Sequence, residues 1–314
     1  MLISRRTAST GLLALMLTLG LAAPTFAQGS AKVGMMISNL GLDPWMNVAI
    51  STIEKGAKAK GFQVTVADGR SDISQMAAAI DRFVVQDMDA IIIYAPDPDS
   101  LVGPVSSAIA KGVPVLAFSA GLSPEAKLTS YIKSDEVKMG REQAELVVKE
   151  LGGKGNVALM MGVLGSSPQL GRSEGQHAVF SKHPNIKIVE EQSNEWAHDK
   201  TVALIQDWLS KYPKGKLDAV IAHGPELVAA AEYAKSVGRT DVKFVALDYP
   251  ADVRKAIIDG TMLATVNQDP GLMGRLTVET LEKVLKGQTV EKEIVIETPM
   301  ITKANAESTP AAYE

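Results

Sequence analysis

The chain has 314 residues, with 32 Lys and Arg against 36 Asp and Glu, a formal net charge of −4 and no cysteine. The lack of cysteine excludes a disulfide framework, a thiolate metal site and a cysteine nucleophile. The acidic balance makes a nucleic acid an unsuitable partner. The length suffices for one large or two medium domains with a hydrophobic core.

Residues 1–27 have the pattern of a secretory signal peptide. Arg5 and Arg6 precede an apolar run over residues 11–23, and a small-x-small cleavage pattern follows that ends at Ala27. The alternative is a membrane anchor, but the apolar run is too short to favour it. We therefore expect export, cleavage after Ala27 and a soluble periplasmic protein. Its net charge changes from −4 to −6 because the two arginines are removed.

The first part of the remaining chain alternates strands with helices. The apolar run over residues 32–38 predicts a strand buried on both faces. Asp43 and Pro44 predict a helix start, because Asp accepts hydrogen bonds at the N-cap and Pro suits the first turn. Further strands are predicted at 62–67, 89–94 and 113–118, with helices at 71–86 and from 99 or 100 to about 111. This alternation predicts a parallel, doubly wound sheet.

The same pattern restarts after a short strand at 128–132 and a long helix at 136–151. Strands are predicted at 156–161, 186–190, 218–222, 242–247 and 262–266, and helices at 173–181, 199–211 and 225–237. A helix at 272–285, a late strand at 294–297 and a tail at 308–314 follow. We therefore predict an α/β fold of two similar doubly wound parallel-sheet lobes joined by a multi-strand hinge.

The lobe boundaries follow from crossovers predicted near 132–135, 266–270 and 297–300. We expect an N-terminal lobe of residues 31–133 plus 269–297 and a C-terminal lobe of residues 134–268 plus 298–307. Several crossing segments form a hinge about which two lobes can close.

Motifs for catalysis are lacking in the sequence. It contains no GxGxxG fingerprint, P-loop, Gly-x-Ser-x-Gly elbow or HExxH pair. The Gly- and Ser-rich residues 162–167 could cradle an anion, although such loops are common. A carbohydrate-cleaving enzyme needs paired carboxylates, and Asp43 with Asp248 is the only obvious pair. We expect no catalytic residue, no metal and no cofactor, and interpret the protein as a binding protein.

The predicted strand ends carry groups that suit a sugar. Sugars and polyols need charge-assisted hydrogen bonds to hydroxyls and flat apolar surfaces against their C–H faces. Trp45 offers such a surface, with packing on the sheet as the alternative, and Asp43 is either a ligand contact or only an N-cap. Asp248 directly follows the strand at 242–247, and Gln268 lies with Asn267 at a strand end at the predicted hinge, so we expect both Asp248 and Gln268 at the ligand.

These features resemble periplasmic sugar-binding proteins of the ribose-binding type, which have a type I periplasmic binding protein fold and serve ABC importers. The resemblance covers residues 32–303. It rests on the motifs Met36-Ile37-Ser38, Asp43-Pro44-Trp45-Met46, Tyr131-Ile132-Lys133-Ser134-Asp135, Arg172-Ser173-Glu174-Gly175, Phe244-Val245-Ala246-Leu247-Asp248, Ala264-Thr265-Val266-Asn267-Gln268 and Val284-Leu285-Lys286-Gly287.

The resemblance implies which residues contact the ligand. The candidates are Asp43, Trp45, Met46, Ser119, Ser134, Arg172, His198, Asp248 and Gln268. The chain departs from the family at several positions. Ser119-Ala120 replaces an Asp-Arg pair, and Ala95 and Gly224-Pro225 replace polar residues. A ligand-binding arginine of the family falls on Leu170, unless the alignment shifts and Arg172 takes its role. We expect a more apolar pocket that takes a polyol or a less common sugar, with polar contacts from His198 or His223.

The resemblance also implies the role. We expect a monomer that captures a sugar or polyol between two closing lobes and delivers it to an ABC permease of the inner membrane. The alternative is a periplasmic signal-molecule receptor that docks to a membrane chemoreceptor or kinase.

Overall fold

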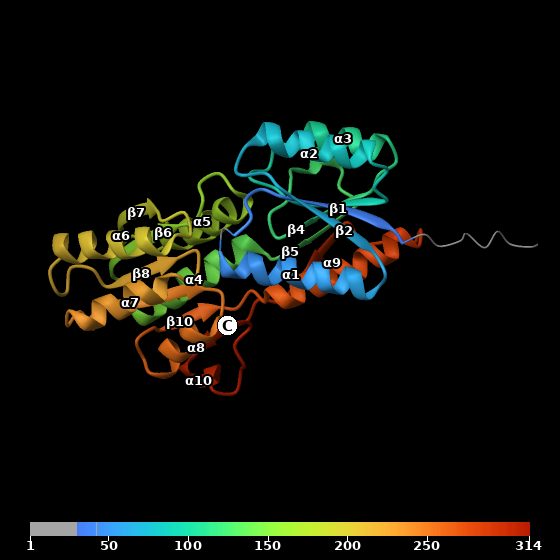
Figure 1. Cartoon of the computed structure of the whole chain (residues 1–314). Helices are drawn as coiled ribbons and strands as arrows, with labels where there is room; N and C mark the ends of the chain where they lie inside the picture. The colour runs from blue at the N-terminus through green and yellow to red at the C-terminus, as the bar shows by residue number, and fades with distance from the viewer. Residues whose placement is uncertain (1–29, 42) are drawn as a thin grey trace, which may run out of the picture.

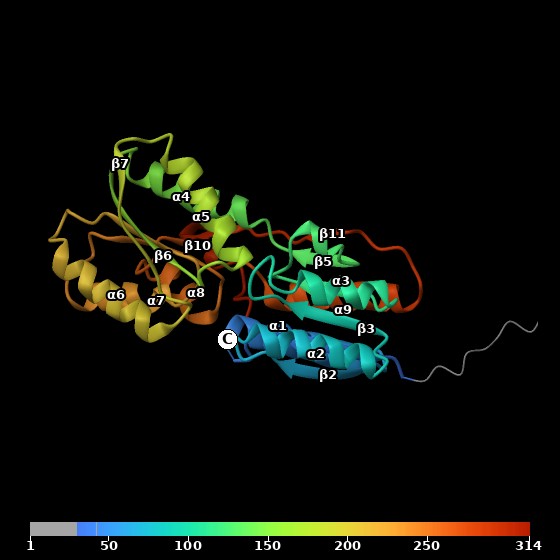
Figure 2. The same cartoon turned by 90° about the horizontal axis from the view of Figure 1, so that it is seen from above.

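The structure is a computed structural model that describes residues 30–41 and 43–314. The expected signal peptide at 1–27 lies outside these residues. The described part of the chain forms two α/β lobes that lie end to end, each built on a six-stranded sheet (Figures 1 and 2). The predicted fold class is confirmed.

The first sheet has the strand order β11-β5-β4-β3-β1-β2, and all of its strand pairs are parallel. Its strands are β1 (Lys32–Ile37), β2 (Gln63–Asp68), β3 (Ala90–Tyr94), β4 (Val115–Phe118), β5 (Ser130–Lys133) and β11 (Glu293–Val295). The helices of this lobe are α1 (Pro44–Ala59), α2 (Ile73–Val85), α3 (Val102–Ala110) and α9 (Pro270–Leu285), with a 3-10 turn η1 at Pro124–Ala126.

The two faces of the first sheet bury different residues of each strand. Met35 and Ile37 of β1 pack with residues of α1 and α9, whereas Met36 packs with residues of α2 and α3. Successive side chains of a strand point to opposite faces, so a continuous apolar run is what a strand covered on both sides requires. Figure 1 shows α2 and α3 on one side of the sheet and α1 and α9 on the other.

The second sheet has the order β12-β10-β9-β8-β6-β7 and is parallel except for the edge strand β12, which runs antiparallel to β10. Its strands are β6 (Gly155–Met161), β7 (Ile186–Ser193), β8 (Ala219–Ala222), β9 (Lys243–Leu247), β10 (Ala264–Val266) and β12 (Met300–Thr302). The helices are α4 (Glu136–Glu150), α5 (Ser167–Phe180), α6 (His198–Lys211), α7 (Leu227–Ser236), α8 (Ala251–Ile258) and α10 (Lys303–Ala306).

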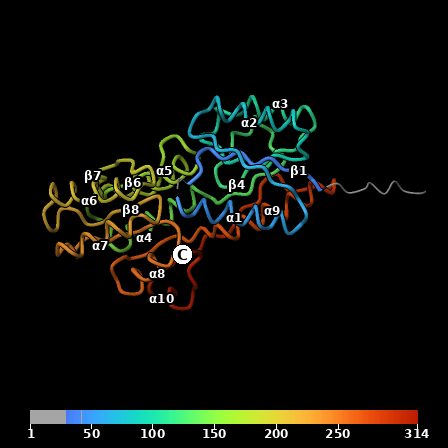
Figure 3. The backbone as a smooth tube through the Cα atoms, viewed as in Figure 1, coloured from blue at the N-terminus to red at the C-terminus, as the bar shows by residue number. Residues whose placement is uncertain are grey.

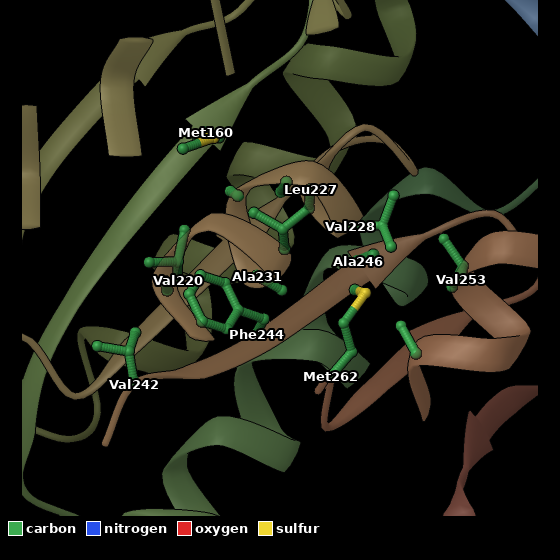
Figure 4. Packing of buried hydrophobic residues seen from close by; sticks show 14 of the residues in the cluster. Met160, Val220, Leu227, Val228, Ala231, Val242, Phe244, Ala246, Val253 and Met262 are labelled. Atoms are coloured by element: carbon green, nitrogen blue, oxygen red, sulfur yellow. The ribbon is translucent and has the colours of Figure 1, made fainter. Parts of the chain in front are cut away.

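Both faces of the second sheet are covered as well. One face carries the larger core, in which Val220 and Phe244 pack with Leu227 of α7 and Met262 (Figure 4), together with the fully buried Trp208 of α6. The opposite face packs against α4 and α5 through Val147 and Val179.

The chain passes between the lobes in three places. The strands β5, β10 and β11 are followed by α4, α9 and β12, each of which belongs to the other lobe. The residues at which one lobe ends and the other begins stay a prediction.

Several elements differ from the sequence-based expectation. The helix α5 begins at Ser167 rather than Ser173, because Ser166 caps it and Pro168 occupies its first turn. The short elements α8, β12 and α10 are missing from the expectation, since each is too short for a clear periodic pattern.

The segment expected as a tail returns to the junction of the lobes. The Ala312 N–H donates to Tyr249 O at 2.8 Å, and Tyr313 O accepts from the Ala251 N–H at 3.0 Å. Tyr313 is 8% exposed and packs into the core of the first lobe. Figure 3 shows the C-terminus at this junction.

Within the described ranges, no helix combines the length and apolar character that crossing a bilayer demands.

Two glycines allow α4 and α5 to lie in close contact. A Cβ atom at Gly140 would lie 2.1 Å from Arg172 O, and one at Gly175 would lie 2.1 Å from Val137 O. Both obstacles are backbone atoms, so the helices would have to separate. Because Arg172 is on α5, this packing fixes the position of the Arg172 backbone, from which its side chain extends.

We predict that Gly140→Ala lowers the free energy of unfolding by about 1–3 kcal/mol, as overpacking does. Urea denaturation measures the change, as a lower midpoint concentration with an unchanged m-value. The control is Gly103→Ala on α3, where an added Cβ meets nothing within 4 Å; it should be neutral or slightly stabilising. Equal effects from the two substitutions would contradict the packing argument.

Candidate functional site

A cavity lies between the two lobes and takes its walls from both. Its lining residues are Asp43, Trp45, Tyr94, Ser119, Pro168, Arg172, Trp196, His223, Pro225, Glu226, Asp248 and Gln268. Its volume is about 30 Å³, which is room for about two water molecules. A ligand of sugar size therefore needs a wider cavity than this one. We call this space the interlobe cavity.

A larger hollow of about 990 Å³ lies at the other end of the first lobe, beside the N-terminal ends of its strands. Two of its charged side chains, Lys60 and Glu282, pair with each other at 2.7 Å. In open parallel sheets, ligands bind at the carboxyl ends of the strands. The interlobe cavity is at that end and is therefore the candidate site.

Strand ends bring the polar groups of the interlobe cavity together. Tyr94 is the last residue of β3, Ser119 follows β4, His223 follows β8, and Asp248 follows β9. Because neighbouring strands are parallel, their carboxyl ends meet at one edge of each sheet. The two edges face each other across the interlobe cavity.

Three lining residues have a backbone conformation that side chains rarely adopt. Ser119, Trp196 and Asp248 have φ angles of 55°, 56° and 70°. A non-glycine residue in this left-handed region costs about 1–3 kcal/mol and persists only where the surrounding structure holds it. Such strain is concentrated at functional sites, so it supports the choice of this cavity.

Arg172 is a buried cation at the centre of the site, 4% exposed. Its Nε donates to Glu136 Oε2 at 2.7 Å, its Nη1 to His223 O at 2.6 Å, and its Nη2 to Gln268 Oε1 at 3.2 Å. One guanidinium therefore connects α5 with α4, with the end of β8 and with the crossing segment after β10.

Gln268 connects the lobes through its backbone and its side chain. Its backbone oxygen accepts from Trp45 Nε1 at 2.7 Å, and its Nε2 donates to Ser134 Oγ at 2.9 Å. Trp45 thus contacts the crossing segment while its ring packs in the core of the first lobe. Asp43 caps α1 by accepting from the Met46 N–H at 2.7 Å and also lines the interlobe cavity.

The loop before α6 and the loop after β8 complete the wall. Asn194 Nδ2 donates to Glu226 Oε1 at 2.6 Å, and Trp196 Nε1 donates to His223 O at 3.2 Å. Burial, assisted by the Arg172 charge, holds the pKa of His223 well below its ordinary value. The imidazole is therefore neutral at neutral pH.

The lining carboxyls hold protons more readily than usual. Burial is the main cause that raises the pKa of Glu226 to about 7; the charge of Asp43 acts in the same direction, and the Asn194 hydrogen bond and the Arg172 charge oppose it. Burial also raises the pKa of Asp43 and, far more, that of Asp248. Asp248 Oδ1 is buried and has no hydrogen-bond partner within the described residues.

A family model described as a periplasmic binding protein domain matches residues 33–289. The chain belongs to this family of periplasmic binding proteins. Its family is one of binding proteins rather than enzymes, and the resemblance predicted from sequence motifs is confirmed.

Individual relatives agree with this assignment. The chain is 30% identical to the xylitol-binding protein of Mycolicibacterium smegmatis over 253 residues, which are 80% of this chain and 72% of the relative. It is 29% identical to the ribose import binding protein of Bacillus subtilis over 262 residues, 83% and 84% of the two chains. An ABC transporter solute binding protein from Bacillus halodurans with bound myo-inositol has a TM-score of 0.83 and 26% identity, and the match covers 90% of this chain and 98% of that one.

The structure of this periplasmic binding protein brings most of the predicted site residues together. Asp43, Trp45, Ser119, Arg172, Asp248 and Gln268 all line the interlobe cavity. Ser134 lies behind the wall, where its hydroxyl holds Gln268. Leu170 is 48% exposed and does not line the cavity. That these residues contact a ligand stays a prediction.

Besides Ser134, two predicted residues do not line the cavity. Met46 is fully buried in the core of the first lobe, because it follows Trp45 on α1 and adjacent helical positions point about 100° apart. His198 is exposed at the first position of α6, because the loop residue Trp196 enters the cavity instead. We correct both placements.

Sequence reasoning missed Tyr94, Trp196 and Glu226 and weighed His223 without choosing it. Tyr94 ends the most strand-like run of the chain, which was a usable signal, whereas Trp196 and Glu226 lie in loops without periodicity. Glu226 adds a third carboxyl to the lining beside the expected Asp43 and Asp248, and a pocket more apolar than in other members of the family stays a prediction.

The raised pKa of Glu226 predicts a pH dependence of stability. An acid whose folded pKa exceeds its unfolded value binds more protons when folded, so it costs stability as the pH rises from about 4.5 to about 7. Glu226→Gln should remove this loss. Its free energy of unfolding should exceed that of the wild type by an amount that grows across that range and reaches about 2–3 kcal/mol above pH 7. Urea denaturation between pH 5 and pH 8 measures the difference. Parallel pH curves for the two proteins would contradict the burial of this carboxyl.

Proposed function

We propose that this periplasmic binding protein captures a sugar or polyol in the interlobe cavity and delivers it to an ABC permease. The observation that carries the proposal is that both lobes contribute aromatic rings and hydrogen-bonding groups to one cavity. Residues 1–27 would direct export and be removed after Ala27, and the mature protein would act as a monomer.

The chemistry of the lining supports a hydroxylated ligand. Trp45, Tyr94 and Trp196 offer flat apolar surfaces for C–H faces, and carboxylates accept short hydrogen bonds from hydroxyls. Four other polar side chains line the cavity. Those of Ser119, Gln268 and the neutral His223 can both donate and accept, and that of Arg172 donates. The names of the relatives, which bind xylitol, ribose or myo-inositol, agree with this class of ligand.

The arrangement also supports transport by closure. A ligand that touches both lobes stabilises the closed arrangement only because it contacts more groups there than in the open one. A permease can then recognise the closed form by the relative position of the two lobe surfaces. Nothing in the geometry of the site favours the alternative of a signal-molecule receptor.

A thermal-shift screen of the mature protein tests the proposal. The panel contains pentoses, hexoses, pentitols and inositols, with and without an amino group. A ligand at 100-fold over its Kd adds about 2.7 kcal/mol to the free energy of unfolding, which gives a clear rise in Tm. A folded protein that shows no rise with any member would refute a sugar or polyol ligand.

We predict that Asp248→Asn weakens binding of the best panel ligand by about 2–3 kcal/mol, because a buried charged acceptor is lost. Asn tolerates the left-handed backbone at this position as well as Asp does, so the fold should persist. Titration calorimetry measures the loss. The control is His198→Ala, a change at an exposed position outside the cavity, which should leave affinity unchanged; an unchanged affinity in Asp248→Asn would remove Asp248 from the site.

A further inference from the structure

The interlobe cavity holds more acidic groups than its cation can balance. Arg172 is the only Lys or Arg among the described residues that line it. Its guanidinium is paired with Glu136, whose side chain is 11% exposed. With His223 neutral, three carboxyls remain without a cationic partner: Asp43, Glu226 and Asp248.

The unbalanced carboxyls are also short of hydrogen-bond donors. Asp248 is 6% exposed, and its Oδ1 has no partner within the described part of the chain although the residue lines the cavity. A buried acceptor left without a donor is unfavourable, so Asp248 Oδ1 is an acceptor available to a ligand. Within the described ranges, the one other residue that donates to the side chain of Glu226 is Asn194, through Nδ2 at 2.6 Å.

The aromatic residues of the lining, like the carboxyls, favour a positively charged ligand. Trp45, Tyr94 and Trp196 border the cavity together with the three carboxyls. The faces of aromatic rings carry negative charge and attract ammonium groups within about 6 Å. Carboxylates and ring faces therefore act together on a cation.

A metal ion does not fit this arrangement as well as an organic cation. Among the residues that the structure describes, no three His, Asp or Glu side chains gather in a way that could hold a metal. The polar groups Ser119, Arg172 and Gln268 meanwhile suit hydroxyls. The ligand should thus combine positive charge with a hydroxylated carbon frame.

We propose that the interlobe cavity takes an amino sugar or an amino polyol, with its protonated amine beside Glu226 and attracted also by Asp43 and Asp248, which line the same cavity. This inference rests on the proposed function, because it names the ligand class of the same site. A protonated amine supplies three donors and neutralises part of the acidic excess, whereas a hydroxyl supplies one donor and no charge.

Matched ligand pairs test the inference at pH 7.5 by titration calorimetry. The pairs are glucosamine with glucose, 1-amino-1-deoxy-glucitol with glucitol, and an aminodeoxy-inositol with myo-inositol. We expect the amine of at least one pair to bind about tenfold or more tightly than its hydroxyl counterpart, and N-acetylglucosamine, which has no charge, to lose the advantage of glucosamine. A tenfold preference corresponds to about 1.4 kcal/mol.

The outcomes separate the two proposals. If the neutral member of each pair binds as tightly as the amine or more so, the inference is overturned while the proposed function stands. If no member of any pair binds to the folded protein, the proposed function fails, and the inference fails with it.

A charge-removing variant locates the amine. Glu226→Gln keeps the oxygen that accepts from Asn194 and should reduce the preference for the amine over its hydroxyl counterpart by about tenfold. The matched control is Glu195→Gln, an exposed acid in the same wall segment as Trp196, which should leave the preference as it is. An equal loss of affinity for both members of a pair in Glu226→Gln would show that the carboxylate serves a hydroxyl, which overturns the inference.

Discussion

The structure of the site depends on one buried guanidinium. Arg172 donates to Glu136, to His223 O and to Gln268, so a helix, a strand end and an interlobe segment take their positions from it. A buried ion pair contributes little to the free energy of unfolding, but removal of one partner lowers that free energy strongly, because the other charge is left buried and unpaired. The close packing of α4 on α5 at Gly140 and Gly175 is what brings Glu136 within 2.7 Å of Arg172. The electrostatics of the cavity is therefore a consequence of helix packing.

The rigid sheets allow the site to hold conformations that the chain would otherwise avoid. Ser119 follows a fully buried strand, Asp248 follows a strand that is buried after its first residue, and both have positive φ angles. Hydrogen bonds fix both turns, since the Ser119 N–H donates to Ile132 O and the Asp248 N–H donates to Val266 O. The strain at these residues is therefore balanced by the sheet, and the strand ends present their side chains without the mobility of a free loop.

The parts of the fold that follow from local chemistry were predictable from the sequence. Apolar runs, the Asp43 cap and the regular alternation of strands and helices determine the two sheets, and strand ends place Asp248 and Gln268 at the cavity. The remaining errors have physical reasons. Met46 and Trp45 are neighbours on one helix, and the choice between them depends on a rotation that only packing fixes. Trp196 and Glu226 enter the site through loop conformations that carry no periodic signal.

On the proposed function, the acidic lining links closure to the ligand. When the lobes approach, water leaves Asp43, Glu226 and Asp248, and burial of unpaired carboxylates is strongly unfavourable. An empty closed form must therefore take up protons, in line with the raised pKa values of all three groups. A ligand that supplies donors removes this cost only in the closed arrangement, where both lobes reach it. The differential affinity that closure requires can thus arise from the desolvation of the carboxylates themselves.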